Sequence, residues 1–254
     1  MSLRVTRTSL AIATAFCAFA CNSIKATPIT VTEDGIGSND TVFINSSTLG
    51  SDLHVYAGIV DLTIVDGART SNVDSFCIDP WHWSVSGPRP YDYEPLTSAP
   101  KPPGPMSAAA ALQIEQLWAQ YMTSPYVLSG DSKTADEWAA AMQLEIWQTL
   151  AGSISGASYS LVSVDNNFAG EATAVLGDLG TMNTFLAHAT KATPRANLFA
   201  VSSGVSRDGV DNPGQDYVIC SVPDGGTTAV LMGLGLLGML ALRRRMQGAP
   251  GHTL

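Results

Sequence analysis

The sequence predicts an α+β protein, in which an antiparallel β-sandwich or barrel-like scaffold carries an inserted helical subdomain. Residues 27 to about 79 are rich in Val, Ile, Thr and aromatic side chains, and Gly, Asp, Asn and Ser separate them into short segments. This composition is typical of short strands joined by turns. Helical periodicity replaces it between residues 107 and 190, and two strand-like segments follow. Strands, then helices, then strands indicate a single domain.

The first strands are expected where β-branched and aromatic residues cluster, and turns are expected between them. The expected strands are residues 29–32, 41–46, 53–65 and 75–79. The expected turns are residues 33–40, 47–52 and 66–72.

A proline-rich segment follows at residues 86–105, where seven of the fourteen prolines lie. Proline lacks the backbone N–H that helices and sheet interiors need. The segment is therefore predicted to be a long exposed loop or strap.

Three helices are expected next, at residues 107–122, 134–152 and 170–190. The second begins with Thr134 and Glu137, which have the spacing of a capping box. The last two strands are expected at residues 197–203 and 215–222.

The first 26 residues have the layout of a secretory signal peptide. Arg4 and Arg7 precede a short apolar run, and Ala26 offers a small residue for cleavage. A lipoprotein signal, with Cys21 as the lipidated residue, is the alternative. The body of the protein, residues 27–221, is then expected outside the cell.

The C-terminal segment, residues 222–246, combines a turn, an apolar stretch and a basic block. Val222, Pro223, Asp224 and Gly225 precede the uncharged residues 227–242. Three arginines follow, Arg243, Arg244 and Arg245. This order predicts a single transmembrane helix whose basic end stays in the cytoplasm.

This segment resembles the PEP-CTERM sorting signals, in the variant that begins Val-Pro-Asp. Gly225 stands where Ser is common in that variant. The resemblance implies export by a Gram-negative bacterium and an exosortase as partner. It also implies transient anchoring in the inner membrane by the C-terminal helix, followed by delivery to the cell surface or extracellular matrix.

The charge of the body excludes some classes of partner. Between residues 27 and 242, seven basic residues face 22 acidic ones, so the net charge is −15. Such a field repels phosphate backbones, which disfavours nucleic-acid binding. No catalytic motif or metal-ligand spacing stands out, and the sequence predicts no cofactor and no metal. The three aspartates of residues 207–216 are interpreted as a polar turn, with calcium binding as the alternative.

Cleavage of the leader would leave two cysteines, Cys77 in "FCID" and Cys220 near the end of the body. In an oxidising compartment two cysteines are usually expected to form a disulfide. A Cys77–Cys220 disulfide in a non-reactive structural protein of a biofilm matrix is therefore one hypothesis. A thiol hydrolase built on Cys77 and a distant histidine is another.

A third hypothesis rests on the thioester domains of Gram-positive surface adhesins, which residues 53–152 resemble. The matching segments are "YAG" at 56–58, "FCID" at 76–79, "IEQLWAQY" at 114–121 and "AAMQLEIWQ" at 140–148. Met142 and Glu145 depart from the adhesin pattern. The resemblance implies an internal thioester between Cys77 and Gln143 that binds an amine or hydroxyl of an extracellular polysaccharide or protein.

The chemistry explains why these residue types are required. A cysteine sulfur that attacks a glutamine amide expels ammonia and leaves an activated acyl group, provided that the two groups are held in near-attack geometry. The bond is used once, so the protein is expected to be a covalent binder and not an enzyme. Asp79 and Glu145 are candidates for orienting or deprotonating the nucleophile. Aromatic neighbours are expected to exclude water, and these are Phe76, Trp81, Trp83 and Trp147.

Overall fold

The computed structural model describes residues 27–101, 104–122, 132–156, 158–165, 170–203 and 214–220. The chain divides into two units, Met1–Cys220 and Ser221–Leu254, and every described residue belongs to the first. The expected leader and the expected sorting segment therefore lie outside the described residues.

The described residues form antiparallel strands and three α-helices, which confirms the α+β class. The strands are β1 (Thr27–Ser46), β2 (Gly50–Asp66), β3 (Arg69–Cys77), β4 (Arg89–Pro95), β5 (Tyr159–Val164), β6 (Leu198–Ser202) and β7 (Tyr217–Cys220). The helices are α1 (Ala108–Tyr121), α3 (Ser132–Ala151), α4 (Glu171–His188) and the short 3₁₀ helix η3 (Leu96–Ser98).

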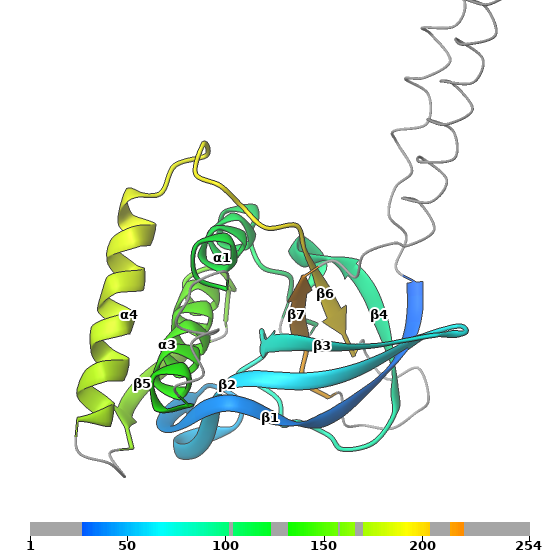
Figure 1. Ribbon diagram of the computed structural model, residues 1–254, viewed down its shortest axis with the longest axis horizontal. Coiled ribbons are helices and arrows are strands. Elements are labelled where there is room, and N and C mark those ends of the chain that lie inside the picture. Colours follow the sequence, from blue (N-terminus) through cyan, green and yellow to red (C-terminus); the bar gives the residue numbers. More distant parts are fainter. Residues whose placement is uncertain are drawn as a thin grey trace, which may run out of the picture. The chain divides into compact units, whose positions relative to one another are not determined.

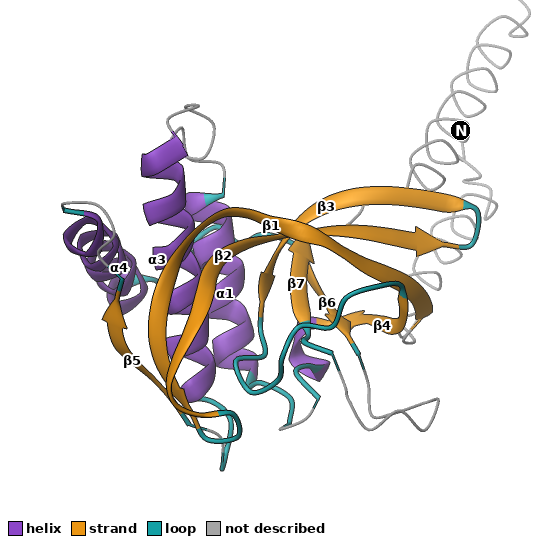
Figure 2. Ribbon diagram, turned by 90° about the horizontal axis from the view of Figure 1, so that it is seen from below, coloured by secondary structure: helices purple, strands orange, loops and turns teal. Residues whose placement is uncertain are grey.

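The strand pairings close into a ring. The sheet has the order β2-β3-β7-β6-β4-β1-β5, and β1 also pairs with β2. Six strands therefore form a barrel-like ring, and β5 adds to the far half of β1, where Ile44 pairs with Leu161. Figures 1 and 2 show how the long β1 and β2 continue from the ring toward the helices. Closure leaves few unpaired strand edges in this part of the protein.

Two of the three expected turns are confirmed, and one is wrong. The chain turns at residues 47–49 and again at Gly67, whose φ of +60° suits glycine. Residues 33–40 instead belong to β1, with register shifts between Glu33 and Gly35 and between Ile36 and Asn39. β-Bulges of this kind absorb turn-like residues without ending the strand.

The proline-rich segment was predicted to be a loop, and part of it is a strand inside the sheet. β4 pairs with β1 on one side and with β6 on the other. Pro90 pairs only with Thr30 of β1, and Pro95 pairs only with Phe199 of β6. Each proline thus lies where β4 has a single neighbour, so its missing N–H breaks no ladder.

The helices agree with the sequence more closely. α1 begins after Ser107, whose side chain accepts a hydrogen bond from the Ala110 N–H, and α4 begins after Gly170. α3 begins at Ser132, two residues before the predicted capping residue Thr134. β5 was not predicted at all. No helix among the described residues is long and apolar enough to cross a bilayer.

Helix α3 is the centre of the helical layer. It packs against β1 and β2 on one side and against α1 and α4 on the other (Figure 1). Every residue from Trp138 to Trp147 is buried, as expected of a helix that is covered all round. Gln143 and Glu145 are the two polar residues within this buried stretch. They lie on opposite sides of the helix.

Candidate functional site

Cys77 is the last residue of β3, in the interior of the protein. Its register partner on β7 is Tyr217, and the next residue, Ile78, donates its N–H to the Asp216 carbonyl at 2.9 Å. The side chain is 3% exposed. Cys77 is therefore paired with β7 on one side, whereas the pairing of β3 with β2 ends one residue earlier, at Phe76.

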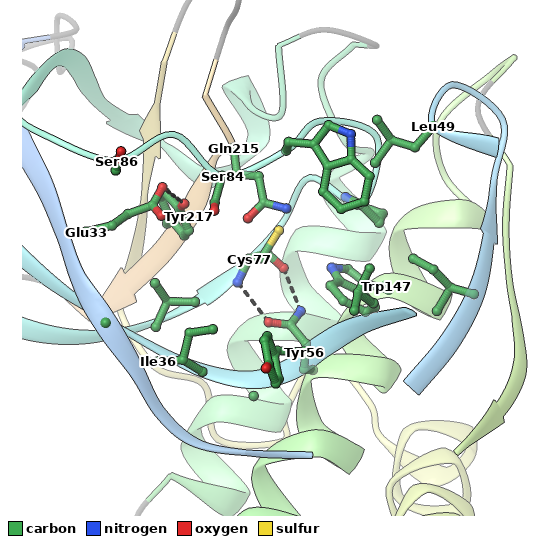
Figure 3. A pocket seen from close by; sticks show the side chains of 18 of the residues that line it. Glu33, Ile36, Leu49, Tyr56, Cys77, Ser84, Ser86, Trp147, Gln215 and Tyr217 are labelled. Atoms are coloured by element: carbon green, nitrogen blue, oxygen red, sulfur yellow. Dashed lines mark hydrogen bonds between the residues drawn. The ribbon is translucent and has the colours of Figure 1, made fainter. Parts of the chain in front are cut away.

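Gln143 of α3 meets Cys77 across 66 residues of sequence. The Cys77 N–H donates to Gln143 Oε1 at 2.9 Å, and Gln143 Nε2 donates to the Cys77 carbonyl at 2.7 Å. Both bonds are drawn as dashed lines in Figure 3, where the Cys77 sulfur points away from them. The structure thus brings together the two residues that the sequence paired. The amide lies against the cysteine backbone, with the sulfur on the other side.

The thiol itself lies in surroundings that disfavour its charged form. Burial raises the pKa of Cys77 well above its usual value, and the nearby Asp79 carboxylate raises it further. The Asp79 N–H donates to Sγ at 3.2 Å. The Trp147 indole N–H is directed at the sulfur and lowers the thiol pKa somewhat by hydrogen bonding, although Nε1 has no partner at full hydrogen-bond distance in the described part of the chain. This donor therefore lies beside the sulfur and is only weakly engaged.

Asp79 donates a hydrogen bond to Cys77 through its backbone, and other groups occupy its carboxylate. Oδ1 accepts from the Trp81 N–H at 3.2 Å, and Oδ2 lies 2.7 Å from His82 Nδ1. Burial raises the pKa of Asp79, and the Asp79 hydrogen bond raises the pKa of His82. Burial also raises the pKa of Asp216 to about 7, with the charge of Asp79 as a second cause. The contact between Asp79 and His82 fixes the loop that follows Cys77.

A cavity of about 420 Å³ reaches the Cys77–Gln143 pair from the surface. Its mouth is aromatic, since Tyr56 is 63% exposed and Trp83 is 50% exposed. Glu33 and Asp34 make it acidic, and Glu33 accepts a hydrogen bond from the Tyr217 hydroxyl. Trp83 therefore lines an entrance, whereas the predicted water-excluding residues Phe76, Trp81 and Trp147 are buried.

Sequence reasoning missed Glu33, Gln215 and Tyr217, which also line this cavity (Figure 3). They lie on or beside β1 and β7, at opposite ends of the body. The closure of the ring places β7 next to β3 and β1 next to β2, and no local pattern marks these residues.

Gly58, in the "YAG" segment, lines the same cavity and has a φ of +158°. A Cβ at this position would lie 2.3 Å from the Ser38 carbonyl oxygen. The bulged part of β1 thus approaches β2 so closely that only glycine fits.

Glu145 does not belong to the Cys77 site. It lines a separate cavity between α1, α3 and α4. Two residues advance a helix by roughly 200°, so Glu145 faces the side opposite to Gln143. Glu145 is therefore not placed to orient or deprotonate Cys77, which is the role that the sequence predicts.

The Cys77–Cys220 disulfide is wrong for this structure, where both cysteines are free. Cys77 pairs with Tyr217, so Cys220 lies three positions further along β7. Three positions are roughly 10 Å, and an odd offset places the two side chains on opposite faces of the sheet. A disulfide needs Cα atoms within about 7 Å. Cys220 is instead exposed.

A metal site is not formed by the described residues, among which no group of three His, Cys, Asp or Glu side chains is suitably placed. Most of the aspartate-rich segment 207–216 lies outside them. His54 lines the Cys77 cavity, stacks on Phe43 and lies 3.4 Å from Asp165.

Comparison with protein families gives a match for the C-terminal segment. Residues 221–246 match the family described as the VPDSG-CTERM motif. This segment is an exosortase-type sorting signal. The protein is accordingly exported, sorted by an exosortase and directed to the cell surface. Comparison with curated proteins and with solved structures gives no match.

Proposed function

We propose that this exported surface protein forms an internal thioester between Cys77 and Gln143 and uses it to attach covalently to an extracellular partner. The observation that carries the proposal is the pair of hydrogen bonds between the Gln143 amide and the Cys77 backbone. The Cys77 N–H donates to Gln143 Oε1 at 2.9 Å, and Gln143 Nε2 donates to the Cys77 carbonyl at 2.7 Å. They hold a glutamine amide beside a buried cysteine at the end of a cavity that opens to the surface. The sequence resemblance to adhesin thioester domains supports the same pairing.

The proposed bond forms by acyl transfer. Cys77 Sγ attacks Gln143 Cδ, the C–N bond breaks, and the thiol proton leaves with the amide nitrogen as ammonia. Gln143 must first leave the Cys77 backbone and turn toward the sulfur. An amine then attacks Cδ, which gives an amide on Gln143 and returns the proton to Cys77. The reaction runs once, so the protein is a covalent binder and not an enzyme.

Neighbouring groups suit this chemistry. The unpaired Trp147 N–H is a donor for the negative oxygen that develops in the tetrahedral intermediate. The Asp79 N–H donates to Sγ, which stabilises the sulfur as the leaving group. Glu33 and Asp34 at the cavity attract an ammonium group more than a neutral hydroxyl, and the amine attacks after it has given up its proton.

Sorting completes the proposal. The C-terminal helix, predicted at residues 227–242, anchors the chain transiently in the inner membrane while the exosortase acts. The released protein then binds a polysaccharide or protein of the cell surface or biofilm matrix.

Intact mass tests the thioester. The processed protein, purified from an exporting host, is expected to weigh about 17 Da less than the calculated mass of its processed sequence, and methylamine is expected to add about 31 Da. Cys77→Ala is expected to abolish both effects. Cys220→Ala is the matched control, because its exposed thiol takes no part, and it is expected to retain both. An unchanged mass in the wild-type chain, with no methylamine addition, would refute the proposal.

A second candidate is a non-reactive structural matrix protein. One observation favours it: the Gln143 amide satisfies both Cys77 backbone groups without any covalent bond. In this case Gln143 has a structural role only, because its two hydrogen bonds join α3 to β3. The mass of the wild-type chain would then equal the mass of its sequence.

A further inference from the structure

A second cavity, of about 560 Å³, lies in the helical layer on the side of α3 opposite to Cys77. The start of α1, the C-terminal half of α3 and the end of α4 form its walls. Small residues such as Ala110 and Gly152 leave the space open, and amide side chains project around it. The cavity thus has a polar lining within a layer of packed helices.

Glu145 lies at the inner wall of this cavity. Its side chain is only 3% exposed, and its Oε2 has no hydrogen-bond partner in the described part of the chain. Burial raises its pKa to about 7. The described residues that line the cavity include no Lys, Arg or His. An unpaired buried carboxylate is costly for a protein, and a bound cation would remove that cost.

Three carboxamide side chains, which offer acceptor oxygens, surround Glu145. Gln113 of α1, Gln148 of α3 and Asn183 of α4 each contribute a carboxamide. Asn183 Nδ2 donates to the Leu179 carbonyl at 3.1 Å and contacts Gln148 Oε1 at 3.5 Å, which leaves Oδ1 as its acceptor atom. A ligand with several N–H donors would therefore find a carboxylate and amide oxygens together.

We propose that this cavity binds a guanidinium group, with the Glu145 carboxylate as its main partner and the surrounding amide oxygens as secondary acceptors. Guanidinium is planar, carries five N–H donors in its alkyl form and is less strongly hydrated than ammonium. It therefore suits a partly desolvated carboxylate better than a lysine-type ammonium does. The group can come from a free alkylguanidine or from an arginine side chain of a partner protein. This site is independent of the thioester.

Isothermal titration of the full chain at pH 8 with ethylguanidinium chloride, against sodium chloride of equal ionic strength, tests the proposal. We expect saturable one-to-one binding. Glu145→Gln, which keeps the shape and removes the charge, is expected to weaken it at least tenfold. The same titration with N-acetylarginine methylamide identifies the source: equal affinity supports an arginine side chain, and binding of ethylguanidinium alone supports a free alkylguanidine.

Two further variants keep the test decisive. Ala187→Trp fills the exposed rim of the cavity without touching Glu145, and it is expected to reduce binding even if Glu145→Gln unfolds. Glu115→Gln, on α1 beside Arg195, removes an equal charge elsewhere and is expected to leave binding unchanged. The proposal is overturned by an absence of saturable binding in the wild-type chain, or by binding in Glu145→Gln and Ala187→Trp that is as tight as in the wild-type chain. Because ethylguanidinium is a poor acyl acceptor, neither result depends on the reactivity of Cys77.

Discussion

Gln143 and Glu145 are two residues apart on the same helix, and both are buried, yet they differ in hydrogen bonding. Gln143 donates one hydrogen bond and accepts another, both with the Cys77 backbone. Glu145 faces the other side of α3, where Oε2 has no partner among the described residues. A buried polar group that is satisfied binds two elements together, whereas one that is not destabilises the fold unless a ligand completes it. One side of α3 therefore carries the residue proposed for covalent chemistry, and the other side faces the cavity proposed for reversible binding.

Gln143→Ala is expected to have the largest effect on stability. The change leaves a buried N–H and a buried carbonyl of Cys77 unpaired and opens a void. We expect a loss of about 3 kcal/mol in the free energy of unfolding, which urea denaturation measures. Gln116→Ala is the matched control, because buried Gln116 makes a single hydrogen bond to the Thr190 carbonyl. If Gln143→Ala loses no more stability than Gln116→Ala, the two hydrogen bonds of Gln143 with Cys77 contribute little to the free energy of unfolding.

Glu145→Gln is expected to change stability in the opposite direction. The pKa of Glu145 is about 7 in the folded state and 4.5 in its ordinary state, so the wild-type protein loses stability as the pH rises from 4.5 to 7. The variant lacks this loss. We expect the free energy of unfolding of Glu145→Gln to exceed that of the wild-type protein by about 2 kcal/mol at pH 8. Below pH 4.5 we expect the two proteins to be almost equally stable.

Urea denaturation of both proteins at pH 4.5, 6 and 8 measures this difference. Asp40 and Asp216 also have raised pKa values, about 6 and about 7, but they are present in both proteins and cancel. A difference that stays constant with pH would contradict an unpaired, ionising Glu145.

Trp147→Phe is expected to have the smallest effect on stability. It removes an indole N–H that has no partner at full hydrogen-bond distance among the described residues and only part of a buried ring, so the free energy of unfolding is expected to fall by about 1 kcal/mol. If the N–H assists acyl transfer, the reaction with methylamine slows roughly tenfold while stability falls only by this amount. Mass spectrometry over time measures this rate. An equal rate in wild type and Trp147→Phe would assign Trp147 to packing alone.

Much of the fold follows from local sequence. The three helices have apolar periodicity and local start signals, such as Ser107, and their bounds agree with the structure within a few residues. The hairpin turn at Gly67 is equally local. The errors lie where long-range pairing overrides local preference. β1 runs through a turn-like segment because β2 pairs along its length, and β4 enters the sheet because its prolines lie where only one neighbour exists.

The sequence by itself determined the sorting signal at residues 221–246 and the α+β class, and it offered Gln143 as one of two candidate partners of Cys77. Each depends on residue types in a fixed order, which a linear pattern can carry. Only the tertiary structure decided that Cys220 is remote from Cys77, that Glu33 and Tyr217 join the cavity, and that Glu145 faces away from it. These facts depend on which strands meet in the ring and on which side of α3 each residue lies. Sheet register and helix rotation set both, because a shift of one or two residues turns a side chain to the opposite face.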